Sequence, residues 1–227
     1  MSVAINDWQV DAVLFDLDGT LVDTAPDLAT ALNVALVQNN QAVLPYETIR
    51  PIVSNGANGL IDLAFGSTLS TKEHEKIKSS LITHYQQNIA NESVIFDGLD
   101  EALLHLEKHQ IPWGIVTNKP EYLTLPLLIE LELVNRASCI VCGDQVNNPK
   151  PHPESILLAC KQMNISPHNA IYIGDAERDI RAGRLAGLKT IACAFGYIPD
   201  TDDINNWQAD KQVDKPADLL KSLLLFT

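Results

Sequence analysis

The sequence predicts an α/β fold in which helices cover both faces of a parallel sheet and a small all-helical unit is inserted after the first strand. Three observations support this prediction. From Ser93 onward, short apolar runs alternate with segments of helical periodicity, which is the order that builds a parallel sheet. The runs are apolar throughout, as expected of strands that are buried on both faces. Residues 25–90, by contrast, show only helical spacing.

The α/β part of the chain contributes strands and helices in turn. Apolar runs predict strands at residues 12–15, 94–96, 112–116, 137–142, 170–173 and 189–194. Helical periodicity predicts helices at residues 99–109, 120–133, 153–163, 177–186 and 216–225. Because a helix follows most of the strands, we expect the strands to run parallel.

The helical insertion begins soon after Gly19. Helical spacing in this part of the chain is shown by Leu28, Ala31, Leu32, Ala35 and Leu36, and by the segments 47–53, 58–65 and 72–89. We therefore expect a helical domain at residues 21–92 and a core domain made of residues 1–20 and 93–227. The two hinges are expected just after Gly19 and at residues 93–98.

The composition excludes several classes of partner. Of the 227 residues, 46% are hydrophobic and 20% are charged, which is typical of a globular protein with a sizeable core. The formal net charge of −13 disfavours binding to nucleic acid or to an anionic membrane, because both need a cationic surface. An anionic substrate must therefore be attracted by a local cation.

We expect a cytoplasmic protein with reduced cysteines. The amino terminus lacks the pattern of a secretory signal, and no apolar run approaches the roughly 18 residues of a membrane span. Cys139 and Cys142 have the spacing of a redox or zinc pair, but no second pair accompanies them. We interpret these two residues, together with Cys160 and Cys193, as core side chains.

Acidic side chains follow two of the predicted strands. Asp16 and Asp18 come directly after the run that ends at Phe15, and Asp175 follows the strand at 170–173. Ligands of open parallel sheets bind beyond the carboxyl ends of the strands. An isolated Asp at such a place is more simply a helix N-cap, but carboxylates that converge from two strands repel one another unless a cation lies between them. Hard oxygen donors suit Mg²⁺, so we expect a magnesium site at this edge.

Two further strand ends supply groups of complementary chemistry. Thr117 and Asn118 offer hydroxyl, amide and backbone N–H groups to phosphate oxygens. Lys150 lies between two prolines, which stiffen the backbone around it. A carboxylate nucleophile, a phosphate-binding hydroxyl, a fixed cation and a metal-binding acid are the groups that phosphoryl transfer requires.

Four segments of the chain resemble, in order, the motifs of the haloacid dehalogenase superfamily. They are DLDGTLVDT from residue 16, VTNKP, KPHPE and GDAERD, which ends at Asp179. The resemblance implies a Rossmann-like, doubly wound core, and the helical segment between the first two motifs resembles the helical cap of one subclass. Asp18 implies phosphate-ester chemistry, because the dehalogenases and phosphonatases of the superfamily lack this second Asp.

The same resemblance implies a role for each motif residue. Asp16 would attack phosphorus and form an aspartyl-phosphate, and Asp18 would protonate the leaving oxygen and then deprotonate water. Thr117 and Lys150 would neutralise the phosphoryl oxygens. The metal ligands would be Asp16, the backbone carbonyl of Asp18, Asp175, and Asp179 in or near the outer shell.

The helical cap is expected to close over the site and to contact the leaving group. Its candidate residues come from the segment IRPIVSNGANG and are Arg50, Ser54, Asn55, Gly56 and Asn58. A plain helix–turn–helix connection explains each of these residues equally well. The cap lysines are interpreted as a solvated helix face and are Lys72, Lys76 and Lys78.

The whole chain resembles bacterial phosphoglycolate phosphatases. Its segment GYIPDTDDINNWQAD resembles more closely a branch that acts on N-acetylmuramic acid 6-phosphate in cell-wall recycling. The resemblance implies hydrolysis of one of these phosphomonoesters. Two alternatives stay open: a sugar phosphomutase that uses the same aspartyl-phosphate, and a non-catalytic binding module on the same fold.

Overall fold

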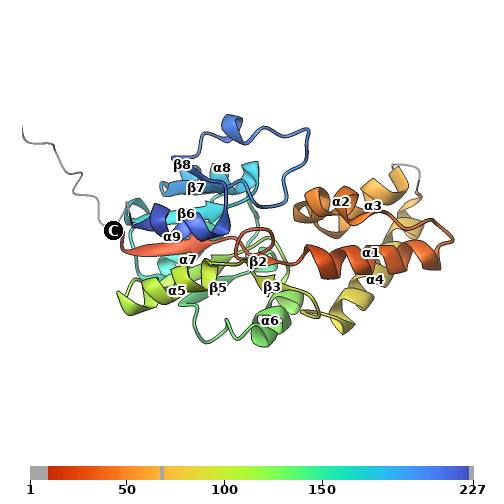
Figure 1. Cartoon of the computed structure of the whole chain (residues 1–227), viewed down its shortest axis with the longest axis horizontal. Helices are drawn as coiled ribbons and strands as arrows, with labels where there is room; N and C mark the ends of the chain where they lie inside the picture. The colour runs from red at the N-terminus through yellow and green to blue at the C-terminus, as the bar shows by residue number, and fades with distance from the viewer. Residues whose placement is uncertain (1–9, 67–68, 225–227) are drawn as a thin grey trace, which may run out of the picture.

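The computed structural model describes residues 10–66 and 69–224 and contains a six-stranded parallel sheet (Figure 1). Its strands are β1 (Ala12–Phe15), β4 (Trp113–Val116), β5 (Cys139–Val141), β6 (Ala170–Gly174), β7 (Lys189–Cys193) and β8 (Lys211–Val213). In space they follow the order β5-β4-β1-β6-β7-β8. The first strand of the chain therefore lies in the interior of the sheet, and the chain winds outward from it in both directions. This arrangement confirms the predicted doubly wound fold.

Helices cover both faces of this sheet. They are α5 (Leu99–Lys108), α6 (Glu121–Glu130), α7 (Glu154–Met163), α8 (Glu177–Ala186) and α9 (Leu219–Leu223). Helices α5, α6 and α9 pack with Val13 and Phe15 of β1 on one face, and α7 and α8 pack with Leu14 on the other. Because successive side chains of a strand point to opposite faces, a strand buried on both faces must be apolar at every position.

The structure contains strands that the sequence did not predict. Strand β8 is an edge strand in which only Val213 is buried, so it carries no apolar run. Residues 94–96 were predicted as a strand, and β3 (Val94–Ile95) pairs antiparallel with β2 (Val22–Asp23) outside the main sheet. This pair brings the two connections between the sheet and the inserted helices side by side.

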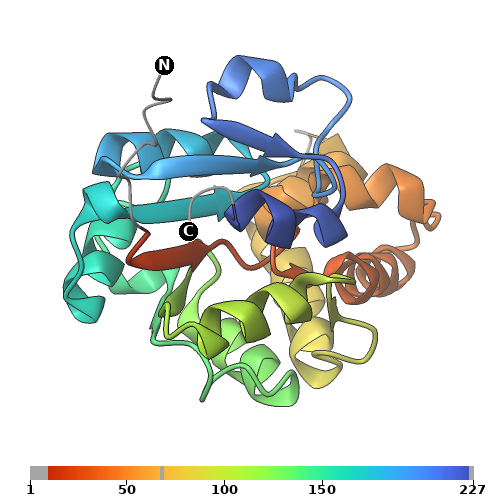
Figure 2. The same cartoon turned by 60° about the vertical axis from the view of Figure 1, so that its left-hand side comes forward.

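The inserted helices form a group beside the sheet, shown in red-orange to yellow in Figures 1 and 2. They are α1 (Ala25–Gln38), α2 (Tyr46–Ile49), the 3₁₀ helix η1 (Arg50–Asn55), α3 (Gly56–Phe65) and α4 (Thr71–Gln87). The single helix predicted at 47–53 is divided into α2 and η1, because Pro51 has no N–H to continue an α-helical ladder. Leu32, Leu60 and Leu81 belong to a buried cluster formed mainly by this group.

We propose that residues 21–92 form a helical domain and that residues 1–20 and 93–227 form the core domain. The separate apolar clusters of the sheet and of the helical group support these boundaries. Within these ranges, residues 1–9, 67–68 and 225–227 lie outside the described residues, and so does the end of the helix predicted at 216–225.

Two buried side chains hold the connections between the domains in place. The Asp27 carboxylate of α1 accepts hydrogen bonds from the backbone N–H and the hydroxyl of Ser93, at 2.9 and 2.6 Å. The Tyr197 hydroxyl, from the core domain, accepts hydrogen bonds from the backbone N–H groups of Thr24 and Ala25, at 2.7 and 2.9 Å. Both connections are therefore anchored by buried hydrogen bonds.

The four cysteines are buried and unpaired in the described structure. Burial and the nearby Cys160 raise the pKa of the Cys139 thiol to about 12, and burial raises that of Cys160 to about 11. A raised pKa disfavours the thiolate that metal binding and redox chemistry need, in agreement with the interpretation of these residues as core side chains. In the described part of the chain, the helices are too short or too polar to cross a membrane.

Candidate active site

The predicted site residues gather at the carboxyl ends of the parallel strands. Asp16 follows β1, Thr117 follows β4, and Asp175 follows β6, while Lys150 comes from the segment after β5. Strands β4, β1 and β6 are neighbours in the sheet, so the residues that follow them emerge at the same edge.

Three buried carboxylates converge at this edge. Ligand oxygens of Asp16, Asp175 and Asp179 lie within 4.8 Å of one another, and the three residues are 4%, 1% and 0% exposed. Burial, followed by repulsion from the neighbouring carboxylates, raises the pKa of Asp16 to about 6 and that of Asp175 to about 7. A divalent cation would relieve this repulsion, and Mg²⁺ prefers oxygen ligands. The cluster therefore fits the magnesium site that the sequence predicts.

Asp175 is held tightly against the first motif. Its Oδ1 accepts a hydrogen bond from the Thr20 hydroxyl at 3.3 Å, and its Oδ2 accepts one from the backbone N–H of Tyr197 at 2.8 Å. Gly19 has a φ of +82°, and a Cβ at this position would lie 2.2 Å from Asp175 Oδ2. The close approach and the left-handed backbone both require glycine at this place.

Lys150 supplies a buried cation beside the acidic cluster. Its Nζ lies 2.8 Å from Asp16 Oδ1 and 2.7 Å from Asp179 Oδ1, and donates a hydrogen bond to the Tyr172 hydroxyl at 2.7 Å. Burial opposes the charge of Lys150, but the two carboxylates outweigh it and raise the pKa of the amine. Asn118 holds the backbone of Lys150, accepting from its N–H at 3.0 Å and donating to its carbonyl at 2.9 Å.

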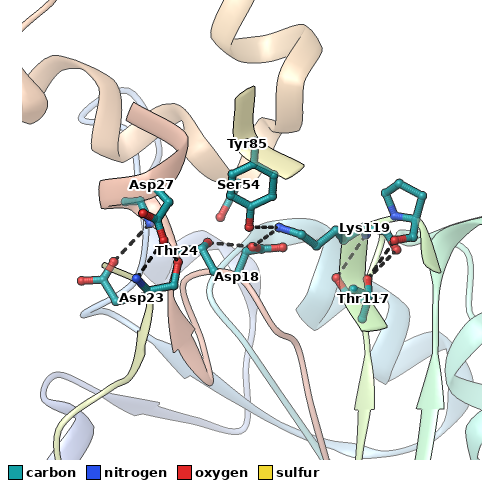
Figure 3. Close-up of polar contacts among 12 residues, drawn as sticks. Asp18, Asp23, Thr24, Asp27, Ser54, Tyr85, Thr117 and Lys119 are labelled. Carbon is teal, nitrogen blue, oxygen red and sulfur yellow. Dashed lines mark hydrogen bonds and ion pairs between the residues drawn. The ribbon is translucent and has the colours of Figure 1, made fainter. Parts of the chain in front are cut away.

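The carboxylate of Asp18 does not join the acidic cluster and makes contacts that the sequence did not predict. Its Oδ1 accepts a hydrogen bond from the Thr24 hydroxyl at 2.7 Å and lies 2.8 Å from Lys119 Nζ (Figure 3). Lys119 also donates to the Tyr85 hydroxyl of α4 at 2.9 Å. Burial opposes the charge of Lys119, but Asp18 and Tyr85 outweigh it and raise the lysine pKa. Lys119 thus links Asp18 to the helical domain.

The helical domain also touches the acidic cluster directly. The Ser54 hydroxyl of η1 donates a hydrogen bond to Asp175 Oδ2 at 3.0 Å. Arg178, in the first turn of α8, donates to the Ser54 carbonyl at 2.7 Å. The inserted helices are therefore in direct contact with residues at the strand ends in this structure.

A cavity of about 550 Å³ is lined by residues of the sheet edge and of helices α1, η1, α3, α4, α6 and α8. Asp16, Asp18 and Thr117 line it from the sheet edge. The other predicted residues that line it are Asn118, Ser54, Asn55, Gly56 and Asn58. Among the described residues that line the cavity, Arg50 is not found. Its guanidinium instead donates hydrogen bonds to the carbonyls of Phe195 and Gly196, at 2.9 and 3.0 Å. Arg50 thus fastens the helical domain to the core domain.

Several residues that line the cavity were not predicted from the sequence. Lys119, Tyr85 and Arg178 acquire their roles from partners that are remote in the chain; Lys119 and Asp18, for example, are 101 positions apart. The interpretation of Lys78 as part of a solvated face is wrong: Lys78 is half-buried and lines the cavity, whereas Lys72 and Lys76 are exposed. The spacing of Lys78, Ile82 and Tyr85 on one face of α4 is the signal that could have placed Lys78 there.

Comparison with known proteins agrees with this geometry. A family model described as haloacid dehalogenase-like hydrolase matches residues 13–193. An N-acetylmuramic acid 6-phosphate phosphatase from Pseudomonas putida is 40% identical over 210 residues, which cover 92% of this chain and 94% of the relative. A phosphoglycolate phosphatase from Xanthomonas campestris pv. campestris is 37% identical over 208 residues, which cover 92% of this chain and 94% of the relative.

The fold is also similar to that of a solved structure. The crystal structure of a predicted phosphoglycolate phosphatase from Haemophilus somnus matches with a TM-score of 0.85 and 28% identity. The match covers 95% of this chain and 98% of the other. The similarity therefore extends over both the sheet and the inserted helices.

Proposed function

Because the chain belongs to the haloacid dehalogenase-like hydrolase family, we propose that it is a Mg²⁺-dependent phosphomonoester hydrolase that works through an aspartyl-phosphate. The observation that carries this proposal is the convergence of three buried carboxylates beside a buried lysine. Asp16 also lines a cavity that is large enough for a small metabolite.

Asp16 is the nucleophile in this proposal. One of its carboxylate oxygens attacks phosphorus, the bond from phosphorus to the leaving oxygen breaks, and the leaving oxygen takes a proton from Asp18. Asp18 then takes a proton from a water molecule, whose oxygen attacks the same phosphorus and releases phosphate and free Asp16. General acid–base help of this kind is typically worth about 10²- to 10⁴-fold in rate.

The remaining site residues bind and neutralise the phosphoryl group. The charge of Lys150, 2.8 Å from Asp16, and the buried Thr117 at the next strand end support a role for both in contacting phosphoryl oxygens. Asp16, Asp175, Asp179 and the backbone carbonyl of Asp18 would hold Mg²⁺, which when bound supplies positive charge to those oxygens. The carboxylate of Asp18 stays outside the metal site because it pairs with Lys119.

N-acetylmuramic acid 6-phosphate is the substrate that we favour. Support comes from the relative from Pseudomonas putida and from the segment GYIPDTDDINNWQAD. The second candidate is 2-phosphoglycolate, supported by the relative from Xanthomonas campestris pv. campestris. With N-acetylmuramic acid 6-phosphate as substrate, the proposal includes a cytoplasmic location and a role in cell-wall recycling.

The test is phosphate release by the purified protein with Mg²⁺, compared between the two substrates as kcat/KM. We expect N-acetylmuramic acid 6-phosphate to give the higher value and Asp16→Asn to abolish turnover of both. A higher value for 2-phosphoglycolate would reverse the substrate assignment. A phosphomutase would need a sugar bisphosphate to activate it, so phosphate release without one would rule out that alternative. Absence of Mg²⁺-dependent release from a panel of phosphomonoesters would overturn the enzymatic proposal.

A further inference from the structure

Lys78 presents a cationic side chain to the cavity from helix α4. It is half-buried and lines the cavity together with Ile82 and Tyr85, which lie four and seven residues further along the same helix. Among the described residues, the other cavity cations have protein partners: Lys119 pairs with Asp18, and Arg178 donates to Ser54. No hydrogen bond or ion pair to Lys78 is found in the described part of the chain. Its ammonium group is therefore available to a ligand.

The position of Lys78 along α4 sets its distance from the chemistry. Tyr85 marks the reactive end of this helix, because its hydroxyl contacts Lys119, which contacts Asp18 (Figure 3). Seven residues of α-helix rise by about 10 Å, or two turns. The Cα–Cβ bond of Lys78 tilts toward the helix amino terminus, away from Tyr85.

Apolar side chains also line the cavity. Leu28, Ile82 and Leu123 line the cavity along with Lys78 and Tyr85. A ligand that fills the cavity would therefore meet the carboxylates of Asp16 and Asp18, apolar side chains and the cation of Lys78. Only a leaving group with a remote negative charge would use all three features.

We infer that Lys78 binds a carboxylate on the leaving group, about two helical turns from the reacting phosphate. This inference rests on the proposed function and names the feature of the substrate that the site selects. In 2-phosphoglycolate a single methylene carbon separates the carboxylate from the phosphate ester oxygen. In N-acetylmuramic acid 6-phosphate the lactyl carboxylate and the phosphate are carried at well-separated positions of a sugar ring. The rise of about two helical turns between Tyr85 and Lys78 favours the second molecule.

A charge-removing variant tests this inference with a matched pair of substrates. Lys78→Met keeps an unbranched side chain that reaches as far as Cε but removes the ammonium group, and Lys76→Met makes the same change at an exposed position of α4. N-acetylglucosamine 6-phosphate is the same sugar phosphate without the lactyl carboxylate. We expect Lys78→Met to lower kcat/KM for N-acetylmuramic acid 6-phosphate roughly 10- to 100-fold. For Lys78→Met, kcat/KM for N-acetylglucosamine 6-phosphate and for 2-phosphoglycolate should change less than about twofold. For Lys76→Met, kcat/KM should change less than about twofold with every substrate.

Equal losses on the two sugar phosphates, or no loss on either, would overturn the inference. A loss of kcat/KM confined to 2-phosphoglycolate would show that Lys78 binds a carboxylate close to the phosphate, and would overturn the proposed distance of about two helical turns. A binding measurement tests the role of Lys78 separately from the proposed catalytic function. In the Asp16→Asn background, calorimetry should show weaker binding of N-acetylmuramic acid 6-phosphate, but not of N-acetylglucosamine 6-phosphate, when Lys78→Met is added. This comparison decides the role of Lys78 even if the wild-type protein turns over neither ester.

Discussion

The Nζ atom of Lys119 lies 2.8 Å from Oδ1 of Asp18, in an ion pair that also contacts Tyr85 of the helical domain. Because Thr24 donates to the same oxygen, Lys119 is one of two groups that orient the carboxylate of Asp18. We expect Lys119→Met to lower kcat roughly 10- to 100-fold with a smaller change in KM, since the proton donor loses its orientation. Steady-state kinetics measures both constants.

The control for this variant is Lys161→Met, which removes an exposed charge from α7. Its kcat should equal that of the wild type. Circular dichroism establishes whether Lys119→Met is folded, because breaking a largely buried ion pair can cost about 3 kcal/mol of stability. An unchanged kcat in folded Lys119→Met would show that the contact does not orient Asp18.

Mg²⁺ is expected to stabilise the folded protein by binding the acidic cluster. At a concentration about 100 times its Kd, Mg²⁺ should raise Tm by about 5 to 10 °C. Asp175→Asn should remove most of this increase, because it replaces one of the three converging carboxylates. Asp62→Asn, at an exposed position of α3, should keep it. If Mg²⁺ raised Tm equally in Asp175→Asn and in the wild type, the metal would bind at a site other than the acidic cluster.

Without metal, the charge of Asp175 is expected to weaken the fold as the pH rises. Burial, then repulsion from Asp16 and Asp179, raises the pKa of Asp175 from 3.8 to about 7. Below the lower value the carboxyl group is protonated in both the folded and the unfolded states. Between the two values only the unfolded state loses the proton, so stability is lost as the pH rises through this window.

Urea denaturation in the presence of EDTA measures this effect as the difference between Asp175→Asn and the wild type. The difference in unfolding free energy should shift in favour of the variant from about pH 4 to about pH 7 and then level off. A difference that is constant over this window would show that the charge of Asp175 carries no such cost.

Gly19→Ala is expected to disturb the metal site. The added methyl group would lie 2.2 Å from Asp175 Oδ2 at a backbone φ of +82°, so the carboxylate must move. We expect weaker Mg²⁺ binding by calorimetry and a fall in kcat/KM. Gly66→Ala is the control, because Gly66 also has a positive φ but, among the described residues, no atom within 4 Å of its added Cβ. Equal effects of the two substitutions would assign the loss to backbone strain alone.

The sequence predicted the sheet and its acidic edge well because both depend on local order. Asp16 and Asp175 each follow an apolar run, and parallel strands end at the same edge whatever their exact pairing. Strand β8 was missed because it has three residues, of which only Val213 is buried. The pairing of Val22 with Ile95 was also missed, because a two-residue strand carries no periodicity.

The contacts between the domains could not be predicted in the same way. Lys119 lies within the VTNKP motif, but its partners Asp18 and Tyr85 become visible only when the helical domain sits against the strand ends. Arg50 was expected to contact the substrate and instead donates to backbone carbonyls of the core domain. Long, flexible cations can reach several partners, and the packing of the two domains decides which one they meet.

The proposed mechanism requires a covalent bond between Asp16 and phosphorus. Rapid acid quenching during turnover of N-acetylmuramic acid 6-phosphate, followed by mass spectrometry of proteolytic peptides, would detect an acyl phosphate. We predict a phosphoryl group on Asp16 in the wild-type protein and none in Asp16→Asn. Phosphate release with no phosphoryl group on Asp16 at any quench time, or with one on another residue, would rule out Asp16 as the nucleophile.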